Sequence, residues 1–244
     1  SRAFGNVVSL SGDGLTLAVG NGSWQGSQTQ YGRSRVSIYK FINGEWTHKG
    51  EPITQEYFNG DSYGGGFGWD IDLNYNGNSI VLSDINDDGI SEENTGVAKG
   101  SVSVYKYYDY TDKWSIIGEK ILGENTGDQL GTSVSINDDG NIIAMSAQAP
   151  IVTINGSLYS KIYQKVNNEW TQIGEDISTG SYYNYNSLAL SGDGTTVVIG
   201  SAQSSENCQD CEDQIGYLKI MSFNNTSSIQ APNGESTQSF CNEA

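Results

Sequence analysis

The chain has 244 residues, enough for one all-β domain with a sizeable core or for two smaller domains. Twelve basic residues stand against 29 acidic ones, which gives a formal net charge of −17 at pH 7. Such a surface repels nucleic acid and anionic membranes, and it attracts cations. No run of about 18 apolar residues is present. We therefore expect no nucleic-acid partner and no membrane insertion.

The composition favours short strands and turns over helices. The chain contains 31 Gly and 15 Tyr, and only 17% of its residues are charged. Helices favour Ala, Leu, Glu and Lys, whereas aromatic and β-branched residues suit strands. The first residue is Ser1 and not Met, so we expect a processed or excised piece that has lost any targeting signal.

The first predicted element is a hairpin in residues 4–20, which read FGNVVSLSGDGLTLAVG. An alternating apolar run that includes Val8 and Leu10 meets the turn Ser11–Gly14, and a second run ends at Gly20. Asp-Gly between two such runs is a strong hairpin signal. The pattern predicts a positive φ at both Asp13 and Gly14.

The same hairpin pattern occurs four times along the chain. Its turn glycines, Gly14, Gly77, Gly140 and Gly194, recur at intervals of 63, 63 and 54 residues. A third strand is predicted after each hairpin, at 35–40, 101–106, 160–164 and 217–221. A fourth strand is marked in three units by a Trp and a Gly four residues apart, as in Trp46/Gly50, Trp114/Gly118 and Trp170/Gly174.

A repeated unit of four antiparallel strands is typical of a β-propeller blade. We expect an all-β propeller domain over residues 1–223. The predicted blades cover about 4–54, 67–122, 130–178 and 184–223. One blade cannot cover both of its own faces, so the alternating apolar residues and the repeated Trp and Tyr are expected to pack between blades.

These motifs resemble those of a known repeat family. The chain resembles the FG-GAP repeats of integrin-α-like propellers in four features: FG before a strand, the SGDG turn, LAVG and a later G-x-V-x-V-Y. They resemble still more closely the FG-GAP-like repeats of secreted microbial and algal proteins. The resemblance covers about residues 4–223 and implies the propeller fold. It implies little about chemistry, because such propellers serve adhesion, ligand binding and scaffolding.

The resemblance weakens along the chain. FG is intact at Phe4-Gly5 and Phe67-Gly68, becomes Leu130-Gly131 in the third unit, and is replaced by Asn184-Tyr185 in the fourth.

The fourth unit lacks a Trp strand, which leaves the ring incomplete by one strand. The tail, residues 224–244, could supply that strand, with Ser228–Gln230 as a poor candidate, and so close a ring of four blades. Alternatively, the chain is part of a larger propeller, or two chains complete one ring. We favour the four-bladed monomer, because an open arc would leave a blade face and strand edges exposed.

The loops between the second and third strands differ most between units, and such loops often carry recognition. Residues 84–92 read D-x-N-x-D-G-x-x-E, in which alternate residues can direct oxygen atoms at one calcium ion. The candidate ligands are Asp84, Asn86, Asp88, the carbonyl of Ile90, and Glu92. The alternative is a solvated acidic loop.

The three cysteines predict a disulfide better than a zinc site, because His48 is the only histidine. The bond is either Cys208–Cys211 or a link from one of these to Cys241, which would pin the tail. Four N-x-Ser/Thr sequons are candidate glycosylation sites: Asn21, Asn155, Asn224 and Asn225. With the acidity, they favour a secreted or cell-surface protein.

No catalytic motif is present, and we expect no catalytic residue. His48 is expected at the surface and not as a general base. A glycosidase needs a pair of carboxylates, and no pair in this sequence is marked as catalytic by the residues around it. Tyr182, Tyr183 and Tyr185 replace the repeat pattern in the fourth unit and are weak candidates for stacking on sugars. Packing is the alternative role for these rings.

The sequence therefore predicts an extracellular or cell-surface binding or adhesion module, stabilised by calcium, that recognises a protein or glycan through its rim loops. The first alternative is a structural subunit of a larger surface assembly with partner subunits. The second is a glycoside-active enzyme.

Overall fold

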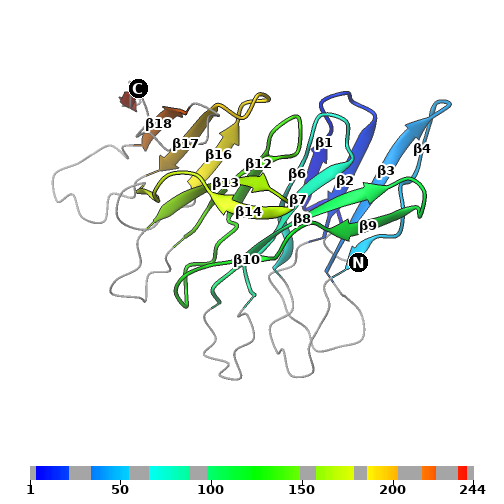
Figure 1. Cartoon of the computed structure of the whole chain (residues 1–244), viewed down its shortest axis with the longest axis horizontal. Coiled ribbons are helices and arrows are strands. Elements are labelled where there is room, and N and C mark those ends of the chain that lie inside the picture. Colours follow the sequence, from blue (N-terminus) through cyan, green and yellow to red (C-terminus); the bar gives the residue numbers. More distant parts are fainter. Residues whose placement is uncertain are drawn as a thin grey trace.

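The chain folds into four antiparallel β-sheets that follow one another in sequence order (Figure 1). This computed structural model describes residues 4–21, 34–54, 66–87, 98–148, 158–178, 186–202, 216–223 and 236–240. Those ranges contain strands β1 to β19 and no helix, and so none that could span a membrane. The predicted all-β class, built from propeller-type blades, is confirmed.

Three sheets have the same five elements. The first comprises β1 (Val7–Leu10), β2 (Thr16–Gly20), β3 (Arg35–Ile42), β4 (Glu45–His48) and β5 (Ile53–Thr54). The second comprises β6 (Phe67–Leu73), β7 (Ser79–Asp84), β8 (Ser101–Tyr108), β9 (Lys113–Ile116) and β10 (Ile121–Leu122). The third comprises β11 (Ser133–Ile136), β12 (Ile142–Ser146), β13 (Tyr159–Val166), β14 (Glu169–Gln172) and β15 (Ile177–Ser178).

The outer strand of these three sheets is divided into two pieces. In the first sheet, β4 and β5 both pair with β3. The break contains Gly50, whose φ is 72°, and Gly118 and Gly174 have φ values of 69° and 73° at the same position in the next two sheets. The Gly four residues after each Trp thus marks the point where the outer strand leaves the ladder.

The fourth sheet takes its outer strand from the tail. It comprises β16 (Asn186–Leu190), β17 (Thr196–Ala202), β18 (Gly216–Ser222) and β19 (Ser236–Phe240). β19 pairs antiparallel with β18, from Ser236↔Ile220 to Phe240↔Gly216. The poor candidate at 228–230 lies outside the described residues, and the observed strand begins eight residues after Ser228.

The hairpin turns are wider than predicted. Gly14 has a φ of 73°, but Asp13 is not among the residues with positive φ, so the expectation for Asp13 is wrong. The Ser11 hydroxyl accepts a hydrogen bond from Thr16 N (2.9 Å) and donates to Asp13 Oδ1 (2.6 Å), which also accepts from Leu15 N (2.9 Å). These side chains satisfy the backbone of a longer loop, so one left-handed residue is enough.

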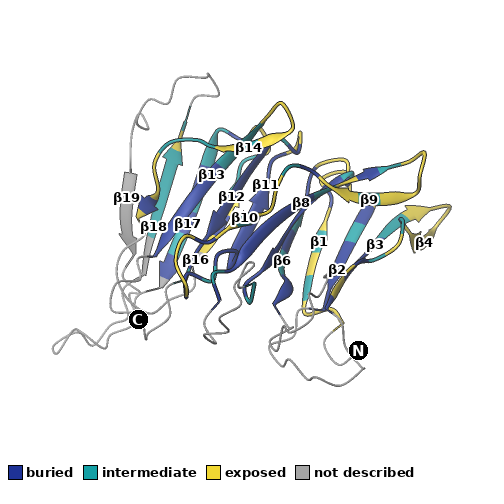
Figure 2. Ribbon diagram, turned by 60° about the horizontal axis from the view of Figure 1, so that its bottom comes forward, coloured by how far each residue is buried: buried dark blue, intermediate teal, exposed yellow. Residues whose placement is uncertain are grey.

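The sheets form an open arc. The inner strands β1, β6, β11 and β16 each contact the next in the series. The first and fourth sheets lie at opposite ends of the molecule in both views (Figures 1 and 2). The predicted closed ring of four blades is therefore not confirmed, because the described strands of the first and fourth sheets lie apart.

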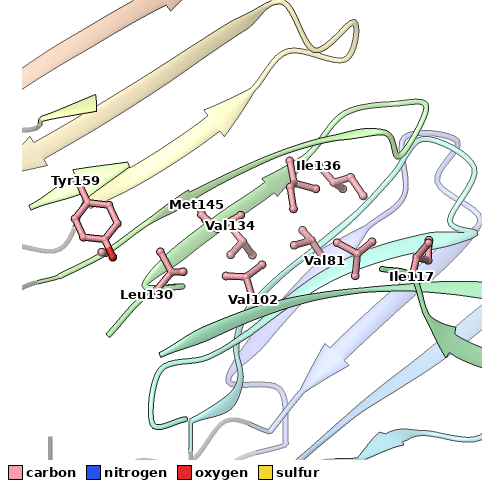
Figure 3. Packing of buried hydrophobic residues seen from close by; sticks show 11 residues of the cluster. Val81, Val102, Ile117, Leu130, Val134, Ile136, Met145 and Tyr159 are labelled. Carbon is pink, nitrogen blue, oxygen red and sulfur yellow. The ribbon is translucent and has the colours of Figure 1, made fainter. Parts of the chain in front are cut away.

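The core lies between consecutive sheets. One apolar cluster joins the first and second sheets, another joins the second and third, and a third joins the third and fourth. In the middle cluster, Val81 and Val102 of the second sheet face Val134 and Met145 of the third (Figure 3). The alternating apolar residues of the repeat thus pack between blades, as expected.

The Phe-Gly motif has a steric role in this packing. Gly68 and Gly131 have φ values of 71° and 101°, in the left-handed region that favours glycine. A Cβ on Gly131 would lie 2.4 Å from Ser83 Cβ in the preceding sheet, and a Cβ on Gly68 would lie 2.9 Å from Val36 Cγ2. Glycine therefore lets the second and third sheets approach the sheet before them, and this holds at Gly131 even though Leu130 replaces the phenylalanine.

We expect Gly131→Ala to lower the free energy of unfolding by about 1–3 kcal/mol more than Gly174→Ala. Both substitutions strain a left-handed backbone, but a Cβ on Gly174 meets nothing within 4 Å, whereas one on Gly131 overlaps Ser83. Urea unfolding of the two variants measures the difference. Equal losses would contradict the close approach at Gly131.

Candidate functional site

The variable connections of all four blades leave the sheets at the same edge. In each sheet the second strand ends, and the third begins, at a residue pair on this edge. The pairs are Gly20↔Val36, Asp84↔Ser101, Ser146↔Ser160 and Ala202↔Gly216. We call this edge the loop rim. The connections themselves, 22–33, 88–97, 149–157 and 203–215, lie outside the described residues.

The predicted calcium loop begins at a buried position on the loop rim. Asp84, the last residue of β7, is 4% exposed. Its Oδ1 accepts a hydrogen bond from Asn86 N (3.2 Å), and its carbonyl accepts one from Asp87 N (3.3 Å). Asp88, Ile90 and Glu92 lie outside the described residues. Asp84 and Asn86 are thus brought together, and the calcium site as a whole stays a prediction.

Asp87 is not among the predicted calcium ligands, and its hydrogen bonds join the start of this loop to its end. Its Oδ2 accepts hydrogen bonds from Ser101 Oγ (2.7 Å) and Lys120 Nζ (2.6 Å), and its carbonyl accepts one from Gly100 N (2.9 Å). The two ends of the 88–97 connection are therefore held side by side. In the described ranges, no group of three or more His, Cys, Asp or Glu could hold a metal ion.

A second polar cluster lies near the third sheet's end of the loop rim. Tyr159 OH donates to the buried Asp128 Oδ2 (2.7 Å), which also accepts from Asn125 N (2.8 Å). Burial, together with the bond to Asp128, raises the pKa of Tyr159 far above its usual value, so this phenol remains a donor. Through Asp128, the cluster ties the connection between the second and third sheets to Tyr159 of β13.

Lys161 is 4% exposed in its side chain and is paired with two acids. Its Nζ lies 2.7 Å from Glu124 Oε1 and 2.7 Å from Asp176 Oδ1. Burial alone would lower its pKa, but the bonds to Asp176 and Glu124 outweigh burial and raise the pKa. The lysine stays charged, and its role is to join three segments.

Lys49 is buried between the first and second sheets. Its Nζ donates to the Gly77 carbonyl and to Asn78 Oδ1, each at 2.7 Å, and lies 5.0 Å from the centre of the Tyr107 ring. Burial lowers its pKa to about 8. Sequence reasoning did not single out this residue, because a lysine next to Gly50 reads as a turn residue.

Two acids on the inner strand β6 bridge to the next sheet. Asp70 Oδ2 accepts from Val134 N (2.8 Å), and Asp72 Oδ2 accepts from Ile136 N (3.0 Å). Asp72 also accepts from Ser135 Oγ (3.0 Å). Burial raises the pKa of both carboxyls, and the bonds from the two backbone N–H groups oppose that rise.

Serine occupies the position of Asp72 in the first sheet, as Ser9, and the positions of both acids in the third, as Ser133 and Ser135. Ser9 Oγ accepts from Leu73 N (2.9 Å), and Ser133 Oγ accepts from Leu188 N (3.2 Å). The paired carboxylates of β6 therefore act as bridges between sheets, in the same place as serine. Sequence reasoning missed them, although acids at alternate positions of a strand whose repeats carry serine were a usable signal.

The remaining predicted residues divide into two groups. His48 is exposed on β4, as expected, and its ring lies 4.6 Å from that of Tyr39. Asn21 is 5% exposed, and its Oδ1 accepts from Arg35 N, so a glycan at this amide stays a prediction. The following lie outside the described residues: Asn155, Tyr182, Tyr183, Tyr185, Cys208, Cys211, Asn224, Asn225 and Cys241.

Comparisons with known proteins give no family assignment. No protein-family model matches the chain, and no curated protein matches its sequence. Among solved structures, an ancestral GH74 enzyme is similar over 95% of this chain and 27% of its own, with 12% identity and a TM-score of 0.49. The tricorn protease is similar over 87% of this chain and 17% of its own, with 11% identity and a TM-score of 0.44.

A putative 6-phosphogluconolactonase from Bacteroides uniformis is similar over 95% of this chain and 71% of its own, with 12% identity and a TM-score of 0.38. The chain thus spans about a quarter or less of the first two structures. The expectation that this chain is not an enzyme stays a prediction.

The raised pKa values of Asp70 and Asp72 predict a pH dependence of stability. With folded pKa values above 3.8, the folded state binds more protons than the unfolded state at pH values from 3.8 up to the folded pKa values. The free energy of unfolding from these groups therefore falls as pH rises through that window. We expect the double variant Asp70→Asn, Asp72→Asn to lose that fall.

The measurement is urea unfolding of the wild type and the double variant at a series of pH values. Relative to the wild type, the variant should gain stability as the pH rises above 3.8. The control is Asp139→Asn, which removes an acid from an exposed turn and leaves both bridging carboxylates in place, so it should keep the fall in stability that Asp70 and Asp72 cause. A difference that is constant with pH would contradict the assigned protonation.

Proposed function

We propose that this chain is an extracellular or cell-surface binding or adhesion module that recognises a protein or glycan through its loop rim. The observation that carries this proposal is that all four variable connections begin and end on that one edge. The sheets provide a base for these connections, and the four units differ most in the loops above it. The resemblance to FG-GAP-like repeats of secreted proteins supports the same function.

Calcium bound by residues 84–92 would stabilise the rim. The start of this segment is fixed by the buried Asp84, and its two ends are joined through Asp87 and Ser101. A calcium ion needs six to eight oxygen ligands, which the intervening acids and carbonyls can supply. In a chain with a net charge of −17, the ion would also relieve repulsion between acids.

Two other functions rank below this one. A structural subunit of a larger assembly is favoured by the exposed apolar face at one end of the arc, described below. A glycoside-active enzyme has less support, because the carboxylates of Asp70 and Asp72 are engaged by backbone N–H and hydroxyl groups of neighbouring strands.

If residues 84–92 bind calcium, the wild type should melt at a lower temperature in EDTA than in calcium. The expected difference is about 5–10 °C when the free calcium concentration is 100 times Kd. Asp88→Ala should melt at the lower temperature with or without calcium, because it removes a central ligand of the pattern. Asp139→Ala removes an acid from an exposed turn and should keep the full calcium response. Differential scanning calorimetry measures all three.

No effect of EDTA on the wild type would contradict the calcium proposal. Recognition is tested separately on a glycan array and against cell-surface extracts, in calcium and in EDTA. Binding in calcium that is lost in EDTA and in Asp88→Ala supports the proposed function. Turnover of a glycoside, abolished by a single carboxylate substitution, would contradict it in favour of the enzyme.

A further inference from the structure

One face of the first sheet is apolar, and its β1 part is exposed. We call it the leading face; β1 and β2 place Val8 beside Val19 and Leu10 beside Leu17 on it. Val8 is 60% exposed and Leu10 is 56% exposed, whereas Leu17 is half-buried and Val19 is 6% exposed. The exposed part of β1 is visible at one end of the arc (Figure 2).

The equivalent residues in the other three sheets are buried, except Leu190, which is half-buried. Ile71 and Leu73 on β6 are 4% and 5% exposed, Val134 and Ile136 on β11 are 4% and 6% exposed, and Leu188 on β16 is 8% exposed. In each case the residues belong to a cluster shared with the preceding sheet. The leading face is thus a blade surface that lacks its preceding blade.

The outer strand of the first sheet also lacks a contact that the outer strands of the second and third sheets make. Trp114 and Trp170 each donate their indole N–H to a carbonyl of the preceding sheet, Lys49 O at 2.8 Å and Ile117 O at 2.9 Å. Trp46 is the equivalent residue of the first sheet, and it is 44% exposed. The described part of the chain gives Trp46 no such bond.

The opposite end of the arc carries the complementary surface. We call the outward side of the fourth sheet the trailing face; Val198 pairs with Ile220 on it, and Leu218 lies two residues away. All three are only half-buried. Their equivalents in the second sheet, Val81, Val104 and Val102, are at most 1% exposed beneath the third sheet. The trailing face lacks its following blade.

One polar feature of the trailing face also fits. In the third sheet, Ser133 Oγ accepts from Leu188 N of the next sheet. Ser187 occupies the position of Ser133 in the fourth sheet and is exposed. Val8 N occupies the position of Leu188 N in the first sheet. Ser187 and Val8 could therefore form the bond that the third and fourth sheets already make.

We propose that the trailing face of one chain packs on the leading face of a second copy, so that two arcs complete one ring. The contact repeats a sheet-on-sheet interface that this chain already makes three times between its own sheets. A head-to-tail contact of this kind leaves one face of each type unpaired unless the ring closes. Two copies cover all four end faces.

The net charge of −17 on each copy opposes association, whereas the two faces are apolar. Added salt screens the repulsion and leaves the apolar contact intact. Dimer formation should therefore strengthen as the salt concentration rises. This proposal does not depend on calcium or on the ligand of the loop rim.

The test is the mass of the chain in solution by light scattering after gel filtration. The wild type should have twice the 26.3 kDa mass of one chain. Leu10→Glu on the leading face and Ile220→Glu on the trailing face should each halve the measured mass. Val166→Glu places the same charge at a 46%-exposed position away from both faces and should remain dimeric.

Mixing the two monomeric variants distinguishes head-to-tail pairing from pairing of identical faces. Leu10→Glu keeps an intact trailing face and Ile220→Glu keeps an intact leading face, so the mixture should regain a dimer with one of each. Circular dichroism confirms that each variant is folded, and Val8→Lys replaces Leu10→Glu if that variant is not. A monomeric wild type, or a dimer that Leu10→Glu leaves intact, would overturn the proposal.

Discussion

Each sheet of this chain is apolar on both faces, and such a sheet is stable only when both faces are covered. The second and third sheets satisfy this condition, since each is packed between two neighbours. The first and fourth sheets satisfy it on one face only. The contrast between Ile71, which is 4% exposed, and Val8, which is 60% exposed, follows from that difference in position. In the described ranges, each end of the arc therefore has one sheet face without a neighbouring sheet.

The distance between sheets is controlled at three levels. On the inner strands, Ser9, Asp72 and Ser133 accept hydrogen bonds from the inner strand of the next sheet. These bonds satisfy backbone N–H groups that the sheet ladders leave unpaired. At the loop rim, glycines such as Gly131 allow a close approach that a Cβ would prevent. On the outer strand, the indole of Trp114 reaches back to the preceding sheet.

The repeats predicted the strands and the sides of the sheets that pack together, because apolar alternation is a local property that a sequence displays directly. They did not predict the open arc, since closure depends on the angle between consecutive sheets, which the packing of many side chains sets. The tail was expected to supply the outer strand of the fourth sheet, but the position of that strand at Ser236–Phe240 was not predicted, because STQSF has only one apolar residue. Asp70 and Asp72 were missed because their importance arises from Val134 and Ile136, which lie about 64 residues away.

The proposed pairing of the leading face with the trailing face of a second copy is tested most directly by hydrogen exchange at a series of protein concentrations. We expect amides of β1 and β18 to exchange faster than those of β7 and β12 when the protein is dilute. We also expect β1 and β18 to become protected together as the concentration rises. Protection of β1 and β18 that is independent of concentration would show that the two faces do not pair.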